Sequence, residues 1–174
     1  SIHQASRRGG WAGTLEFVFD PRGPGSSWLA EVKAHQFLDV IGPLGKSFAY
    51  PAKLTTCLLV AEGHGSAPMY FLGQELLARG KRVDMLVGAE TQELVFKPIE
   101  GKRLAQTIVI TTEDGSLGET GGVIDVLPQV VESTGAQVIY AATGRQTLRR
   151  ISEFCAERRI PAQMIEIIAV LIAA

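Results

Sequence analysis

An apolar run, Leu58–Ala61, leads into the glycine-spaced turn Gly63-His64-Gly65, and a helix is predicted to open at Ala67-Pro68. Glycines let a backbone approach a pyrophosphate closely, and the start of a helix offers unpaired N–H groups and the positive end of a dipole. This stretch therefore indicates a binding site for a phosphorylated cofactor. The same arrangement also serves as a plain connection between a strand and a helix, so both interpretations stay open at this point.

Further candidate residues follow other predicted strands. They are Thr112-Glu113-Asp114-Gly115-Ser116 and Thr143-Gly144-Arg145, together with Glu62 before the glycine turn. Glycines and hydroxyls dominate, with acids among them, and the sequence shows no Ser-His-Asp, Cys-His or paired-carboxylate pattern. His3 and His35 have no sequence neighbours that would complete a metal site. The pattern favours holding a cofactor over hydrolysis.

The elements that position these residues alternate in type after Lys53. Strands are predicted at Thr55–Ala61, Arg82–Ala89, Gln106–Thr111 and Gln137–Ala142, and helices at about Pro68–Arg79, Gly122–Glu132 and Arg145–Arg158. This alternation predicts an α/β, Rossmann-like parallel sheet with helices on both faces. Ligands of such sheets lie beyond the carboxyl ends of the strands, so the residues after each strand should share one edge.

The first 50 residues show a different pattern. Apolar and polar residues alternate in Thr14–Phe19 and Gln36–Ile41, between glycine- and proline-rich turns at Arg22–Gly25 and Gly42–Gly45. This is typical of a small antiparallel β unit. We expect two parts, residues 1–50 and 51–174, that pack closely around Phe48–Lys53.

Composition excludes several classes of function. The 174 residues carry a formal net charge of −1, and no basic stripe interleaved with aromatics is present, which argues against nucleic-acid binding. Cys57 and Cys155 are expected to be buried, reduced thiols of a cytoplasmic protein. No leader pattern is present, and the longest apolar run, Ile165–Ala174, contains Glu166 and falls short of the roughly 20 residues of a membrane helix.

The start of that run is predicted to form a fifth parallel strand, buried on both faces. Its end is expected to be covered by a second copy of the chain, by a partner subunit, or by the chain's own core. Arginines gather around the last predicted helix, at Arg145, Arg149, Arg150, Arg158 and Arg159. They form either a solvated face or a docking surface for an acidic partner.

Several motifs together resemble one known family. They are Ser1-Ile2, Gly23-Pro24-Gly25-Ser26-Ser27, Gly42-Pro43-Leu44-Gly45, Gly63-His64-Gly65-Ser66-Ala67-Pro68 and Asp114-Gly115-Ser116-Leu117-Gly118. In order and spacing they resemble the ferredoxin-NADP reductase superfamily, and within it the electron-transfer subunits of dihydroorotate dehydrogenase. The resemblance implies an FAD-binding antiparallel β-barrel, here partial, followed by an NAD-binding α/β domain. It further implies electron transfer between NAD(H) and a partner dehydrogenase subunit in pyrimidine biosynthesis.

The resemblance also assigns cofactor contacts by position. For FAD and its junction with nicotinamide these are Ser1, Gly25, Ser26, Gly42, Pro43 and Leu44. For NAD they are Gly63, Gly65, Ala67 and Pro68 in the phosphate turn, and Asp114, Gly115 and Ser116 in a loop beside the dinucleotide. Carboxylates after a strand accept hydrogen bonds from ribose hydroxyls and repel a 2′-phosphate, so Glu113 and Asp114 favour NADH over NADPH.

Departures from the family pattern favour a second hypothesis. Ala142 stands where the family commonly has a cysteine beside the nicotinamide, and Glu62 brings negative charge to the phosphate turn. The family's [2Fe-2S] cluster is expected from the resemblance, but two cysteines cannot supply its four thiolate ligands. The alternative is a non-catalytic nucleotide-binding or assembly subunit with a degenerate flavin site, and the chain is either a fragment or such a subunit.

Overall fold

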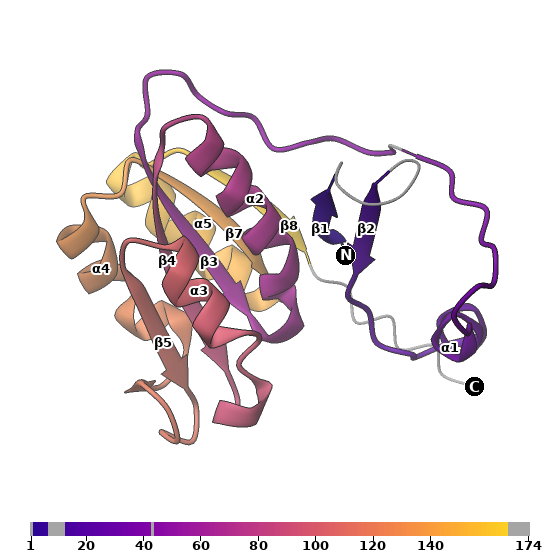
Figure 1. The fold of residues 1–174 in the computed structure, drawn as a ribbon. Coiled ribbons are helices and arrows are strands. Elements are labelled where there is room, and N and C mark those ends of the chain that lie inside the picture. Colours follow the sequence, from indigo (N-terminus) through magenta and orange to yellow (C-terminus); the bar gives the residue numbers. More distant parts are fainter. Residues whose placement is uncertain (1, 7–12, 43, 167–174) are drawn as a thin grey trace.

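The computed structural model describes residues 2–6, 13–42 and 44–166. A six-stranded sheet carries helices on both faces, and a separate two-stranded sheet lies beside it (Figure 1). Ser1, Trp11, Pro43 and the end of the apolar run, residues 167–174, lie outside the described residues.

The larger sheet is parallel throughout. Its strands are β3 (Thr56–Glu62), β4 (Arg82–Ala89), β5 (Ile108–Thr112), β6 (Glu119–Thr120), β7 (Val138–Thr143) and β8 (Ala162–Glu166). They lie in the order β6-β5-β4-β3-β7-β8, so the direction of winding reverses between β3 and β7. The central strands β3 and β7 are apolar almost throughout because both of their faces are buried.

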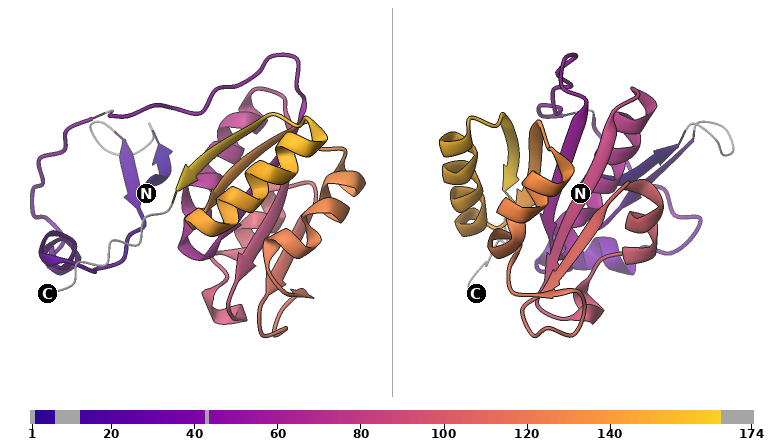
Figure 2. Two further views of the ribbon diagram at one scale, coloured as in Figure 1. Left: turned by 180° about the vertical axis from the view of Figure 1, so that it is seen from behind. Right: turned by 90° about the vertical axis from the view of Figure 1, so that its left-hand side faces the viewer.

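Helices cover both faces of this sheet, as predicted (Figure 2). The helices α2 (Ser66–Ala78) and α3 (Pro98–Leu104) lie on one face, and α4 (Val123–Thr134) and α5 (Arg145–Arg158) lie on the other. Short 3-10 turns, η1 (Gly63–Gly65) and η2 (Gln92–Leu94), follow β3 and β4. Of the helices in the described residues, none is both long and apolar enough to cross a membrane.

Two apolar cores result, one on each side of the sheet. The core beneath α2 includes Leu59, Tyr70 and Cys57, and the core beneath α4 and α5 includes Ile139 and Cys155. Both cysteines are buried and unbridged, and burial raises the pKa of the Cys155 thiol to about 11. The predicted buried thiols are therefore confirmed.

The N-terminal part pairs β1 (Ile2–Ser6) with β2 (Thr14–Phe17) in antiparallel fashion, and α1 (Pro24–Glu31) follows. The strand β1 packs against α2. The connecting segment lies on the larger sheet at Phe48, whose ring meets the Tyr140 ring edge-on at 5.4 Å between centroids. In addition, the Tyr140 hydroxyl donates to the Ala49 carbonyl at 2.9 Å.

Three local expectations differ from the structure. Gln36–Ile41 alternates in polarity but forms no strand. No strand of the described residues pairs with this segment, and its apolar side chains are exposed. The expected turn at Arg22–Gly25 instead opens α1, with Pro24 in its first turn, where a missing N–H costs nothing. The fifth strand of the expected sheet, β8, lies at the sheet's edge, so its Ile165 is 40% exposed instead of buried on both faces.

Candidate functional site

A cavity of about 800 Å³ lies at the carboxyl ends of β3, β4, β5 and β7. Residues that follow these strands line it, among them Glu62, Glu90, Glu113 and Gly144. The strand order reverses between β3 and β7, and open parallel sheets bind their ligands at such a reversal. The fold therefore places this cavity where a nucleotide-binding protein has its site.

Glu62, the last residue of β3, is half-buried in the cavity wall. Burial raises the pKa of its carboxyl, a hydrogen bond with the Thr147 side chain opposes this rise, and the negative charge of Glu113 adds to it. Gly88 on β4 packs beside Glu62: a Cβ at residue 88 would be in ordinary contact with Glu62 Cγ at 3.4 Å, but would stand only 2.6 Å from Val123 Cγ1. The carboxyl is therefore held in a confined, acidic part of the cavity.

The predicted phosphate turn forms one border of the cavity. Gly63 has a φ of +53°, and a Cβ built on it meets no atom within 4 Å, so its backbone is open to a ligand. The helix α2 begins directly afterwards, at Ser66, whose buried hydroxyl has no hydrogen-bond partner in the described structure. Gly65 and Ala67 are buried behind the turn, and Pro68 is half-buried. Gly63 alone of these predicted residues lines the cavity.

The second predicted loop, after β5, is held by its own hydrogen bonds. Asp114 Oδ1 accepts from the Ser116 backbone N at 3.0 Å and from the Ser116 hydroxyl at 2.6 Å, and these bonds hold the pKa of Asp114 below its ordinary value. Gly115 supplies the positive φ of +72° that the turn needs. Glu113 lines the cavity, whereas Asp114, Gly115 and Ser116 lie beside it in the sequence and do not line it.

The N-terminal part supplies a further stretch of the cavity border, next to the phosphate turn. Asp20 and Arg22, which follow β2, line it together with His64 of the phosphate turn. Asp20 Oδ2 lies 2.9 Å from Arg22 Nη2 and 3.5 Å from His64 Nε2. His64 thus lies beside a carboxylate of the other part of the chain.

The expected flavin contacts are not gathered at this cavity. Gly25 and Ser26 lie in the first turn of α1, where the Ser26 hydroxyl accepts from the Gly23 backbone N at 3.1 Å. Gly42 and Leu44 are exposed on the connecting segment. The remaining two, Ser1 and Pro43, lie outside the described residues.

Several lining residues escape sequence analysis. They are Asp20, Arg22, Glu90, Glu93, Phe96, Lys97 and Thr147. Most of them come from loops and helix starts whose approach to the sheet edge depends on tertiary packing, and no spacing rule marks them. Within the described ranges, no group of three His, Cys, Asp or Glu residues is placed to hold a metal ion.

Charges around the cavity are unevenly distributed. Its carboxylates are Asp20, Glu62, Glu90, Glu93 and Glu113, and its cationic groups are Arg22 and Lys97, with His64 as a titratable third. A diphosphate is compatible with the border formed by Gly63, the start of α2 and Arg22, while the carboxylates are suited to accept hydrogen bonds from sugar hydroxyls. The residues present thus fit a dinucleotide.

Comparison with known proteins identifies similar chains. No family model matches the sequence. The dihydroorotate dehydrogenase B (NAD(+)) electron transfer subunit of Desulforamulus reducens is 29% identical over 164 residues, which cover 94% of this chain and 62% of the relative. The subunit of the same name from Geobacillus kaustophilus is 35% identical over 144 residues, covering 81% of this chain and 54% of the relative. The chain therefore spans little more than half the length of these curated relatives.

Solved structures show the same fold. A chain from the structure of NADH-dependent reduced ferredoxin-NADP oxidoreductase matches with a TM-score of 0.69 and 20% identity, over 86% of this chain and 54% of the other. The ferredoxin reductase in carbazole 1,9a-dioxygenase matches with a TM-score of 0.65 and 17% identity, over 89% of this chain and 50% of the other. The predicted fold class and the predicted resemblance are confirmed.

Proposed function

We propose that this chain binds NAD(H) at the carboxyl edge of its parallel sheet and serves as an electron-transfer subunit, passing reducing equivalents between NAD(H) and a partner dehydrogenase through FAD. The observation that carries the proposal is the cavity bordered by Gly63 and the start of α2 at the reversal of strand order. The relatives named as electron transfer subunits support an assignment to dihydroorotate oxidation. We further propose that the chain acts in pyrimidine biosynthesis and in the cytoplasm.

In this proposal the chain's own residues bind and orient the nucleotide. The open backbone at Gly63 and the N–H groups at the start of α2 receive the diphosphate, with Arg22 as the nearby cation. Glu113 accepts from ribose hydroxyls and disfavours a 2′-phosphate, which selects NADH over NADPH. The flavin supplies the hydride chemistry when bound, while the protein supplies alignment.

The described residues do not by themselves enclose a flavin. A second hollow, lined by Trp28, Glu31, Val32, Gln36, Phe37 and Leu38, measures about 220 Å³. Ligand pockets generally need about 300–1,000 Å³. We therefore propose that this chain holds FAD weakly, and that further parts of the assembled protein complete the flavin site.

Titration calorimetry with NADH and NADPH tests the nucleotide site. We expect NADH to bind more tightly, and equal or inverted affinities would remove the argument from the carboxylates. An absorption spectrum of the purified chain, and of a form extended at its N-terminus with the family's flavin motif, tests the flavin site. We expect little flavin in the former and retained flavin in the latter.

A second candidate function is a nucleotide-binding or assembly subunit without turnover. It is favoured by Glu62 in the cavity wall and by fully buried Ala142 at the end of β7, where the family commonly has a cysteine. NADH oxidation by the protein with added FAD and an artificial electron acceptor separates the two. Tight NADH binding without flavin and without oxidation would favour this second function.

A further inference from the structure

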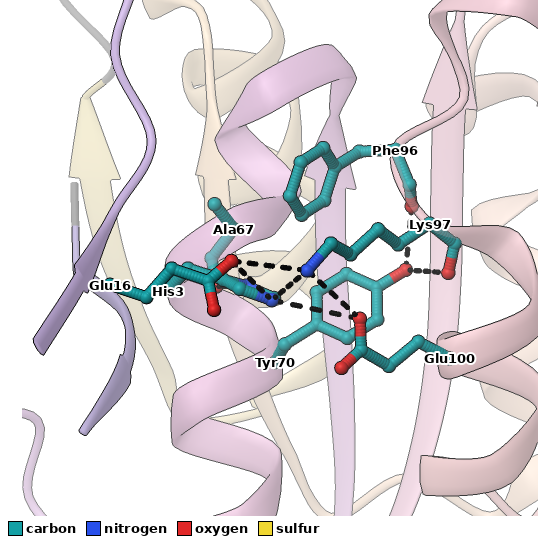
Figure 3. A network of polar contacts seen from close by, with 7 residues as sticks. All are labelled: His3, Glu16, Ala67, Tyr70, Phe96, Lys97 and Glu100. Carbon is teal, nitrogen blue, oxygen red and sulfur yellow. Dashed lines mark hydrogen bonds and ion pairs between the residues drawn. The ribbon is translucent and has the colours of Figure 1, made fainter. Parts of the chain in front are cut away.

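His3 of β1 is buried against the other part of the molecule. Its side chain is 1% exposed, and its ring meets Tyr70 of α2 at 5.5 Å and Phe96 at 5.2 Å between centroids, both edge-on. Most large apolar residues around it in the N-terminal part, such as Leu15 and Phe17, are exposed instead. His3 is thus a main anchor of the two-stranded sheet on α2 (Figure 3).

The hydrogen bonds of His3 assign its tautomer. Nδ1 lies 3.2 Å from the Ala67 carbonyl oxygen, which only accepts, so Nδ1 carries the proton. Nε2 lies 3.0 Å from Lys97 Nζ and accepts from this ammonium group. The Lys97 ammonium also lies 3.2 Å from Glu16 of β2 and 3.5 Å from Glu100 of α3. One imidazole therefore joins the N-terminal sheet to both α2 and the α3 region.

The residues that His3 contacts belong to the surroundings of the cavity. Ala67 lies in the first turn of α2, directly after Ser66. Phe96 and Lys97 line the cavity, and Lys97 has the strained φ of +43°. Tyr70 holds this strained wall, because its hydroxyl lies 2.7 Å from the Phe96 carbonyl and 2.9 Å from the Lys97 carbonyl. Burial raises the pKa of Tyr70 to about 12, so the hydroxyl keeps its proton for these carbonyls.

We propose that His3 is a positioning residue that couples the placement of the N-terminal sheet to nucleotide binding in the cavity. His3 lies outside the cavity lining, yet it contacts the helix that opens at the phosphate turn and the wall at Phe96 and Lys97. One placement of the N-terminal sheet holds the cavity wall at Phe96 and Lys97 in the form that binds nucleotide, and so strengthens nucleotide binding. By linkage, bound nucleotide favours this placement of the sheet by the same factor. The inference rests on the proposed function, since it takes the cavity as the NAD(H) site.

Three variants at residue 3 separate its two hydrogen bonds. His3→Asn keeps a donor at the place of Nδ1 for the Ala67 carbonyl, and His3→Gln keeps an acceptor near the place of Nε2 for Lys97. His3→Leu removes both. Glu16→Gln weakens the link from β2 to Lys97 and leaves the imidazole's own bond to the Ala67 carbonyl in place. Leu15→Ala is the matched control, because Leu15 lies on β2 with 54% exposure.

Two measurements are made on each variant: the Kd for NADH by fluorescence titration, and amide hydrogen exchange of β1 and β2 with and without NADH. In the unsubstituted protein we expect NADH to slow exchange in both strands. In His3→Leu we expect the Kd to rise about tenfold, within the usual range of coupling between sites, and the protection by NADH to be lost. His3→Asn and His3→Gln should each keep part of the affinity for NADH and part of the protection. Glu16→Gln should lose less of both than His3→Leu does, and Leu15→Ala should leave both readouts unchanged.

The failures are distinguishable. Absence of NADH binding in the unsubstituted protein would refute the proposed function and this inference with it. A folded His3→Leu protein that keeps the original Kd, with exchange in β1 and β2 independent of NADH, would overturn this inference alone. If His3→Leu does not fold, His3→Asn and Glu16→Gln decide the question. An unchanged Kd for NADH and unchanged protection in both of these variants would overturn the inference.

Discussion

Replacement of Gly63 by alanine tests whether the turn after β3 receives phosphate. Gly63 has a φ of +53° and its added Cβ would meet no atom within 4 Å, so the substitution strains the backbone without a clash. A left-handed conformation costs an L-residue about 1–2 kcal/mol, and in a chain of this size each kcal/mol lowers the Tm by roughly 2–4 °C. Alanine at this position should therefore fold and be modestly less stable.

The effect on nucleotide binding should be larger. The new methyl group occupies the open space through which a diphosphate would approach the backbone. Loss of one hydrogen bond to a charged group costs about 1.5–3 kcal/mol, which corresponds to roughly a 10- to 150-fold weaker Kd for NADH. Calorimetric titration with NADH measures this change, and thermal unfolding measures the stability.

Gly135→Ala is the matched control. Gly135 ends α4 with a φ of +65°, its added Cβ also meets no atom within 4 Å, and it does not line the cavity. It should lose a similar amount of stability and keep its affinity for NADH. If Gly63→Ala binds NADH as tightly as Gly135→Ala does, the turn is only a connection and the argument for a phosphate site there is refuted.

Three further predictions concern buried groups. The pKa of Glu62 is raised in the folded state, so the folded protein binds more protons than the unfolded chain as pH rises above the ordinary value of 4.5. This carboxyl therefore lowers the free energy of unfolding as pH rises. Glu62→Gln should raise the Tm at pH 8, and this gain should shrink toward pH 4.5. Burial raises the pKa of both thiols, so Cys57 and Cys155 should react with a thiol reagent only after denaturant is added. Arg82→Met should cost about 3 kcal/mol in urea unfolding, because it leaves the Asp84 carboxylate, 1% exposed, without its cation.

Each of these has a result that contradicts it. A gain for Glu62→Gln that is equal at both pH values would show that its charge is not the cause. Thiols that react rapidly in the native protein would mean that the two cores open readily. For the ion pair, Arg149→Met is the control, since the Arg149 side chain is 83% exposed and its pair with Glu153 should contribute little. Equal losses in both arginine variants would refute the role of burial.

The parallel sheet could be predicted from sequence because its signals are local. The apolar run Leu58–Ala61 lies inside β3. The strand predicted at Arg82–Ala89 has the bounds of β4, and the one predicted at Gln137–Ala142 is shifted by one residue from β7. Gly135 ends α4 in the left-handed conformation, as its position after the helix predicts. A strand buried on both faces is nearly continuous apolar sequence, so it stands out without knowledge of its neighbours.

The N-terminal part and the edge strand were predicted less well because their structure depends on neighbours. Alternation in Gln36–Ile41 is the pattern of a half-buried strand, but a strand also needs a hydrogen-bonding partner, and the described structure places none beside this segment. Likewise Ile165 lies in an apolar run, yet β8 is the last strand of the sheet and stays partly exposed. The polarity pattern alone does not distinguish an edge strand of a sheet from a central strand.

His3 shows the same limit at the level of a side chain. Its sequence neighbours offer no partner, and its contacts with Ala67, Phe96 and Lys97 lie 64 or more residues away along the chain. The cavity residues that sequence analysis did find, such as Gly63 and Glu113, directly follow strands. The topology of a parallel sheet predicts such positions, whereas contacts between separate parts of the chain have no comparable rule.

The charges of the cavity indicate that the proposed nucleotide binding depends on both parts of the chain, on either side of the boundary near residue 50. The ends of the sheet's strands contribute carboxylates, among them Glu62 and Glu113, which repel a diphosphate. Arg22 comes from the N-terminal part, and the ammonium of Lys97 is held 3.2 Å from Glu16 of that part. Within the described part of the chain, both permanent cations that line the cavity are thus supplied or oriented by the first 50 residues. Nucleotide binding is therefore expected to require both parts of the chain, even though the phosphate turn lies entirely in the second.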